Sequence, residues 1–140
     1  MIVLDTNVVS ALMKPSANQV VFDWLDTQPR ASIWTTAITV FEIRYGLQIL
    51  PSGRKRSALI AAFERLVSET MDNRIAPFDS SAGEHAGELM AVRHKKGRPG
   101  EFRDTMIAGI VLARRAVLAT RNTAHFEDLN VRVINPWGID

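Results

Sequence analysis

Met1-Ile2-Val3-Leu4-Asp5-Thr6-Asn7 is the stretch that decides the fold, because a short apolar run ends at once in an acid, a hydroxyl and an amide. The apolar run predicts a short buried strand, and helical spacing of apolar residues follows it. Short apolar strands that alternate with helices form βαβ crossovers, whose parallel strands lie in a sheet covered on both faces. The polar residues then stand at the carboxyl end of the strand, where open parallel sheets bind ligands.

The rest of the sequence repeats this alternation of strand and helix. Pro77 places the strand that contains it near an edge of the sheet, because proline cannot donate a ladder hydrogen bond. We expect an α/β fold, a three-layer α/β/α domain with a mostly parallel sheet of four to five strands, in a single domain over residues 1–140. The expected strands are Ile2–Leu4, Ala31–Thr35, Arg74–Phe78, Val117–Thr120 and Val131–Ile134, and the expected helices are Val8–Met13, Val20–Leu25, Ala37–Ile49, Arg54–Glu69, Ser81–Lys96 and Arg103–Arg115.

Two of these helices carry more specific signals. Ser81 with Glu84 fits a capping box at the start of its helix. The helix over 37–49 shows the three-to-four spacing that predicts a buried apolar face. The residues with this spacing are Ile38, Phe41, Tyr45 and Ile49.

Composition narrows the class of protein more than its function. With 46% hydrophobic and 23% charged residues the chain is typical of an ordinary globular domain. It has no cysteine, which excludes disulfides, thiolate zinc sites and thiol nucleophiles. No basic segment followed by a long apolar core marks a signal peptide, and the best membrane candidate, 105–113, is far shorter than the roughly 20 residues of a spanning helix. We expect a cytoplasmic protein.

The net charge of +2 is small, so the distribution of charge matters more than its sum. One basic cluster is Arg54-Lys55-Arg56. The other surrounds Asp104 and would draw a polyanion towards it, although a solvated helix face is an equal alternative. This second cluster consists of Arg93, Lys95, Lys96, Arg98 and Arg103.

Four side chains with acid or amide groups are expected at the carboxyl edge of the sheet: Asp5, Glu42, Asp104 and Asn122. Carboxylate and amide oxygens hold hard cations such as Mg²⁺ and Mn²⁺, and a bound cation relieves the repulsion between crowded carboxylates. The pattern favours one divalent-metal site. His125 lies near the same rim, where a chance surface position is the favoured interpretation.

Each acid also has a purely structural alternative. Asp5 or Thr6 could cap the helix that follows, and Thr39 with Glu42 matches a capping box. Asp104 could balance the positive end of a helix dipole. Their joint placement on one rim favours the functional interpretation.

The order of these segments resembles the PIN-domain ribonucleases, in particular the VapC- and FitB-type toxins of type II toxin–antitoxin pairs. The resemblance spans nearly the whole chain. The segments that carry it are 1–7 (MIVLDTN), 39–46 (TVFEIRYG), 103–108 (RDTMIA), 119–122 (ATRN) and 133–137 (VINPW).

The resemblance implies a Mg²⁺- or Mn²⁺-dependent endoribonuclease in which Asp5, Glu42 and Asp104 hold the metal and water is the nucleophile. Asn122 stands where the family often has a fourth acid, which leaves a second metal open. Thr6 and Thr120 match hydroxyls that orient carboxylates or water. Contacts to RNA are expected from Arg121, Lys95, Lys96, Arg98 and Arg103.

The resemblance also implies partners: an RNA substrate, a cognate antitoxin, operator DNA through that antitoxin, and a second copy in a homodimer. Two other functions stay open. A phosphotransferase that uses Asp5 as nucleophile wants a second acid two residues on, where this chain has Asn7. The second alternative is a catalytically weak or inactive PIN-fold binding module, which would act mainly through a complex with an antitoxin and DNA.

Overall fold

The computed structural model describes residues 1–138 and holds a five-stranded sheet of order β3-β2-β1-β4-β5. Every neighbouring pair is parallel, with Ile2 opposite Ile33 and Leu4 opposite Ala119. The prediction of a mostly parallel sheet is confirmed, and the edge position expected from Pro77 is that of β3. The strands are β1 (Ile2–Leu4), β2 (Ile33–Thr36), β3 (Ile75–Ala76), β4 (Val117–Ala119) and β5 (Val133–Ile134).

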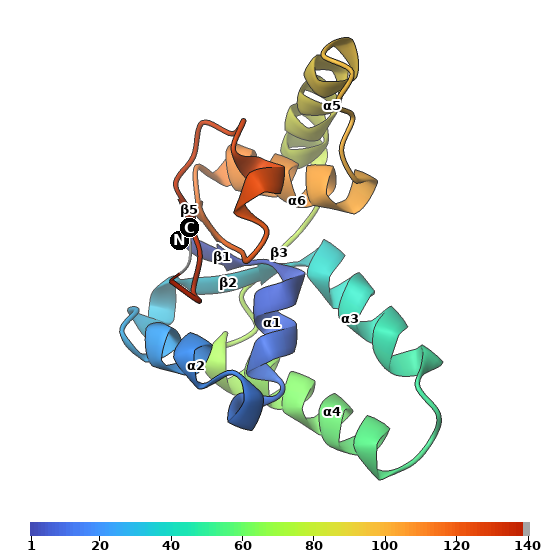
Figure 1. Cartoon of the computed structure of the whole chain (residues 1–140), viewed down its shortest axis with the longest axis vertical. Helices are drawn as coiled ribbons and strands as arrows, with labels where there is room; N and C mark the ends of the chain where they lie inside the picture. The colour runs from blue at the N-terminus through green and yellow to red at the C-terminus, as the bar shows by residue number, and fades with distance from the viewer. Residues whose placement is uncertain (139–140) are drawn as a thin grey trace.

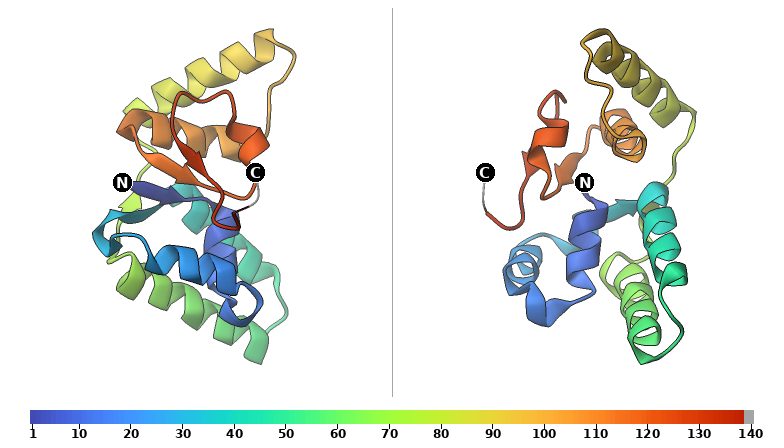
Figure 2. Two further views of the ribbon diagram at one scale, coloured as in Figure 1. Left: turned by 60° about the vertical axis from the view of Figure 1, so that its left-hand side comes forward. Right: turned by 45° about the vertical axis from the view of Figure 1, so that its right-hand side comes forward.

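Helices cover both faces of this sheet, as Figures 1 and 2 show. Four lie on one side, and α5 and α6 lie on the other, so the three-layer prediction is also confirmed. The first group is α1 (Thr6–Leu12), α2 (Gln19–Asp26), α3 (Ala37–Ile49) and α4 (Arg54–Arg65), which a π-helical turn, η3 (Leu66–Thr70), extends. The second group is α5 (Ser80–Lys95) and α6 (Phe102–Arg114).

The central strand β1 serves both layers because successive side chains point to opposite faces. Ile2 and Leu4 belong to the core under α1, α2 and α4, whereas Val3 belongs to the core under α5 and α6. On the second face the two helices pack closely at Gly109. A Cβ there would lie 2.5 Å from the backbone oxygen of Ala82 and 2.7 Å from the Cβ of Ala86.

Helix starts differ in detail from the sequence expectations. The cap of α5 is Asp79, whose carboxylate accepts from the backbone N–H of Ala82, so the capping box at Ser81 is wrong by two residues. The cap of α3 is Thr36, which accepts from the backbone N–H of Thr39, so Thr39 does not cap that helix. The expected outer strands were too long, because only two residues of each pair with a neighbour.

The predicted buried face of α3 is wrong for three of its four residues. Phe41, Tyr45 and Ile49 are 59%, 57% and 66% exposed. The helix buries Ile43 and Leu47 instead. The outward-facing three form the α3 stripe, an apolar surface one helix long. Over residues 1–138, no helix has the length and apolarity to cross a membrane.

Candidate active site

Asp5 follows β1 directly and begins the site. Its Oδ1 accepts from the backbone N–H of Thr6 at 2.8 Å, so Asp5 does cap α1. Its Oδ2 accepts from the Thr120 hydroxyl at 2.8 Å and from the Asn7 amide at 3.3 Å. The carboxyl group is 3% exposed. Burial, together with a smaller effect of the nearby carboxylates of Asp104 and Glu42, raises its pKa to about 6, although the hydrogen bonds from Thr120 and Thr6 lower it.

Glu42 reaches the same place from the second turn of α3. One of its carboxylate oxygens accepts from the Thr6 hydroxyl at 2.8 Å, and that hydroxyl also lies 3.0 Å from the hydroxyl of Thr39. The other oxygen lies 3.6 Å from a guanidinium nitrogen of Arg103. Glu42 is therefore held by a threonine from α1 and a cation from α6.

Asp104 lies in the first turn of α6, where Glu101 supplies the cap. The Glu101 carboxylate accepts from the backbone N–H of Asp104 at 2.9 Å. The Asp104 carboxylate lies 3.0 Å from Nδ1 of His125. His125 is exposed, as expected for a surface position, and its ring contacts one of the three acids.

The turn after β4 joins the site through Thr120 and Asn7. The Thr120 hydroxyl donates to Asp5 and accepts from the Asn7 amide at 3.2 Å and from the backbone N–H of Asn122 at 3.1 Å. The side-chain oxygen of Asn7 accepts from the backbone N–H of Arg121 at 3.0 Å. Asn7 is thus a site residue that sequence reasoning passed over, although it belongs to the opening motif. The side chain of Asn122 is exposed.

The expected basic residues divide into two groups. Lys95, Lys96, Arg98, Arg103 and Arg121 are exposed. Of these, Arg103 pairs with Glu101 at 3.0 Å as well as with Glu42, and Arg121 stacks on the ring of Trp137 with 4.7 Å to the centroid. Arg93 differs from the surface cation that the sequence predicted, because it is 6% exposed and binds Asp128.

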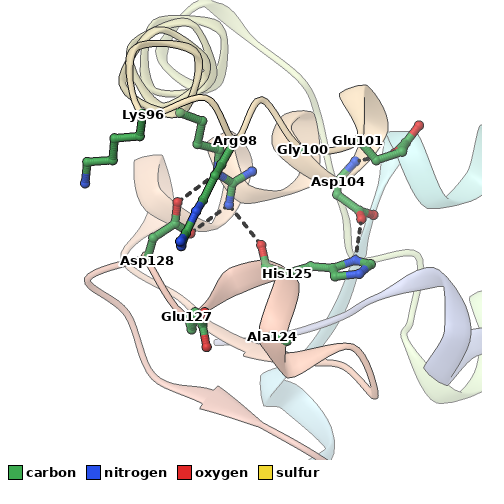
Figure 3. Close-up of a pocket in the computed structure, with 10 residues that line it drawn as sticks. Lys96, Arg98, Gly100, Glu101, Asp104, Ala124, His125, Glu127 and Asp128 are labelled. Carbon is green, nitrogen blue, oxygen red and sulfur yellow. Dashed lines mark hydrogen bonds and ion pairs between the residues drawn. The ribbon is translucent and has the colours of Figure 1, made fainter.

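A pocket of about 470 Å³ opens beside Asp104, and Figure 3 shows the residues that line it. Asp128 lies on one side of it, and the contact between His125 and Asp104 lies on the other. The lining contains more acidic side chains than lysine and arginine side chains, so the pocket alone does not favour the binding of an anion. The lining residues are Arg93, Lys96, Arg98, Gly100, Glu101, Asp104, Ala124, His125, Glu127 and Asp128.

The donor set suits a hard divalent cation. Three carboxylates come from the end of β1, from α3 and from α6, and the charges of two of them raise the pKa of the third. Carboxylate oxygens are the ligands that Mg²⁺ and Mn²⁺ prefer. Among the described residues no three acids or histidines converge into a ready coordination sphere. Arg103 lies 3.6 Å from Glu42, and His125 lies 3.0 Å from Asp104.

The sequence and the fold of the chain are similar to those of known proteins. The family profile described as PIN domain matches residues 2–131. The VapC ribonuclease Y4jK of Sinorhizobium fredii is 37% identical over 137 residues, which cover 98% of each chain. Toxin FitB of Neisseria gonorrhoeae is 33% identical over 137 residues, which cover 98% of this chain and 99% of FitB. In the structure of FitAB bound to an IR36 DNA fragment, one chain matches with a TM-score of 0.88 and 32% identity, over 100% of this chain and 98% of that one.

Proposed function

Since the chain belongs to the PIN-domain family, we propose that it is a divalent-metal-dependent endoribonuclease and the toxin of a type II toxin–antitoxin pair. The observation that carries the proposal is the gathering of Asp5, Glu42 and Asp104 from three separate elements at the carboxyl edge of the sheet. The pKa of Asp5, raised mainly by burial and further by the charges of Asp104 and Glu42, supports it, because a buried carboxylate beside two others is costly without a cation.

Asp5, Glu42 and Asp104 would hold the metal, Mg²⁺ or Mn²⁺. When bound, such an ion activates water and neutralises charge on the phosphoryl oxygens. The chain then supplies orientation. The hydroxyl of Thr6 holds Glu42, and the hydroxyl of Thr120 holds Asp5, so each carboxylate keeps one direction.

Asn122 offers a neutral oxygen where a fourth acid would add charge. One metal site is therefore proposed, and a second would bind more weakly. The exposed cations beside the site, Lys95, Lys96 and Arg98, would contact the phosphates of RNA together with Arg103 and Arg121. These contacts favour a polyanion without selecting a base, because phosphates carry no sequence information.

The proposed partners are an antitoxin, operator DNA bound through that antitoxin, and a second copy of the chain. The FitAB structure bound to DNA supports the first two. The α3 stripe supports the third, since three adjacent large apolar side chains on one helix face are unusual on a monomer. Sedimentation that shows only monomer at micromolar concentration would remove the homodimer from the proposal.

The decisive experiment incubates purified, antitoxin-free protein with total RNA in Mn²⁺ or Mg²⁺, beside a chelator. Two variants follow the same purification, Asp104→Asn and the matched control Asp26→Asn, which changes an exposed acid at the end of α2. We expect discrete fragments that require metal and persist in Asp26→Asn. Asp104→Asn should reduce their rate by more than about 100-fold, since even residues that only orient metal ligands are worth 10- to 100-fold.

The same experiment tests the second candidate function, a PIN-fold binding module with weak or no catalysis. Normal folding and antitoxin binding without any cleavage and without Mn²⁺ affinity would favour the module. Cleavage that survives both chelator and Asp104→Asn would instead indicate a contaminating nuclease and would count against the proposed site.

A further inference from the structure

Arg93 is the buried cation that the proposed reaction does not use directly. It lies in the last turn of α5, and its planar guanidinium makes hydrogen bonds to three separate partners. Nε and one terminal nitrogen donate to the two oxygens of Asp128, each at 2.8 Å. The same terminal nitrogen donates to the backbone carbonyl of His125 at 2.9 Å, and the other donates to the Thr105 hydroxyl at 3.2 Å.

Two of the three partners of Arg93 adjoin Asp104. Thr105 follows Asp104 in α6, and its hydroxyl also donates to the backbone carbonyl of Glu101 at 3.0 Å. His125 lies in η4 (Thr123–Phe126), and its ring contacts Asp104. One guanidinium therefore fixes the start of α6 and the carbonyl of the residue that faces it.

The wall of the site that contains His125 is also anchored by Phe126 and Leu129, which are buried in the core on that face of the sheet. Apolar packing of Phe126 holds the segment against the core but does not fix its orientation. The directional hydrogen bonds of the Arg93 guanidinium fix that orientation. Lysine could keep the charge of Arg93 but could not span three partners with fixed geometry.

We propose that Arg93, with Asp128, is a positioning pair that sets the register between α6 and residues 122–126, and so places His125 against Asp104. The inference rests on the proposed function for its catalytic consequence. Arg93 itself touches neither substrate nor metal. Its geometric consequence, the order of residues 122–126, is independent of catalysis.

The test compares Arg93→Lys with a matched control, Arg65→Met, which removes an exposed arginine from α4 on the far layer. Amide hydrogen exchange is followed over residues 122–129 and over α4. Steady-state cleavage of an RNA oligonucleotide in Mn²⁺ gives kcat and KM. Arg93→Lys should raise exchange in 122–129 at least tenfold and leave α4 unchanged. It should lower kcat by about tenfold to a hundredfold, the range for moving a group by about 1 Å, with KM changed less than threefold.

A double variant, Arg93→Met with Asp128→Leu, separates positioning from stability. Only the Arg93 member of this pair is buried, and replacing both partners by apolar residues avoids leaving its charge or that of Asp128 unpaired. We expect this variant to unfold at a urea concentration close to that of the wild type and still to show the low kcat and the fast exchange of 122–129. Recovery of wild-type kcat together with wild-type stability would show that the pair only stabilises the fold, and would overturn the inference.

The two proposals fail in different ways. If the wild type cleaves no RNA, the proposed function fails, and hydrogen exchange still decides whether Arg93 orders residues 122–126. If the wild type cleaves RNA and Arg93→Lys leaves both exchange and kcat unchanged, only the positioning role is refuted.

Discussion

Asp5 provides the sharpest test of the site, because its buried carboxyl group links folding to pH. The pKa is about 6 in the folded chain and 3.8 at its ordinary value, so the folded state keeps a proton that the unfolded state has released. Stability from this group is therefore fully present below pH 3.8 and is lost as pH rises through 6. The loss by pH 8 is about 3 kcal/mol, from the pKa difference at 1.36 kcal/mol per pKa unit.

Asp5→Asn removes the charge and keeps the shape. The new amide oxygen can still accept from the backbone N–H of Thr6, but the amide nitrogen cannot accept from the Thr120 hydroxyl or from the Asn7 amide. Two lost hydrogen bonds cost about 2 kcal/mol. The variant should therefore be about 1 kcal/mol more stable than the wild type at pH 8. At pH 5 the wild type is mostly protonated and regains about 1.4 kcal/mol, so the variant should be about 0.4 kcal/mol less stable there.

Urea unfolding in chelator between pH 5 and pH 8 measures this difference. Subtracting the wild-type free energy of unfolding from that of Asp5→Asn cancels the pH dependence of the other groups. Asp26→Asn serves as the control, with a difference near zero throughout. A wild-type and Asp5→Asn difference that stays constant with pH would refute the assignment of Asp5 as a buried, crowded carboxyl group. Added Mn²⁺ should stabilise the wild type more than Asp5→Asn.

Three further changes test separate features. Arg103→Ala removes a guanidinium that competes with a cation for Glu42, so it should lower the Mn²⁺ concentration for half-saturation by a few-fold, as measured by calorimetry. Gly109→Ala places a methyl group against the backbone of α5 and should cost about 1–3 kcal/mol by overpacking, whereas Gly87→Ala, with open space around it, should gain about 0.5–1 kcal/mol in urea unfolding. Phe41→Glu in the α3 stripe should shift sedimentation from dimer towards monomer and leave the circular dichroism spectrum of the folded chain unchanged, because the side chain is exposed.

Each of these has an outcome that counts against it. Unchanged Mn²⁺ affinity in Arg103→Ala would show that Arg103 does not compete measurably with the cation for the Glu42 carboxylate. Equal effects of Gly109→Ala and Gly87→Ala would contradict the close contact between α5 and α6. A dimer that persists in Phe41→Glu would move the proposed interface away from the stripe.

The sequence predicted correctly those features for which a local pattern is compatible with only one structure. Alternating short strands and helices lead to a parallel sheet, and a parallel sheet brings the ends of β1 and β4 to one edge. The meeting of Asp5 with Thr120 follows from this topology. The roles of Asp5, Glu42 and Asp104 as metal ligands stay predictions, as do the RNA contacts.

Other features depended on tertiary packing that no local pattern encodes. Helix α3 carries two apolar stripes of the same period, one through Phe41 and Tyr45 and one through Ile43 and Leu47. Periodicity could not decide which stripe faces the core. Arg93 belongs to a run of cations in the sequence, yet its side chain is buried. It binds Asp128, which lies 35 residues further along the chain, so no local pattern could predict the contact.

The position of β1 at the centre of the sheet has a consequence for how the molecule is made. β1 is synthesised well before β4, with which it pairs, and Asp5 bonds to Thr120, 115 residues later. Such sequence-distant contacts form late and slowly during folding. A growing chain on the ribosome holds Asp5 and Glu42 long before it holds Asp104 and the turn after β4. The proposed nuclease would therefore be inactive towards the messenger RNA that encodes it until Asp104 and the turn after β4 have been synthesised.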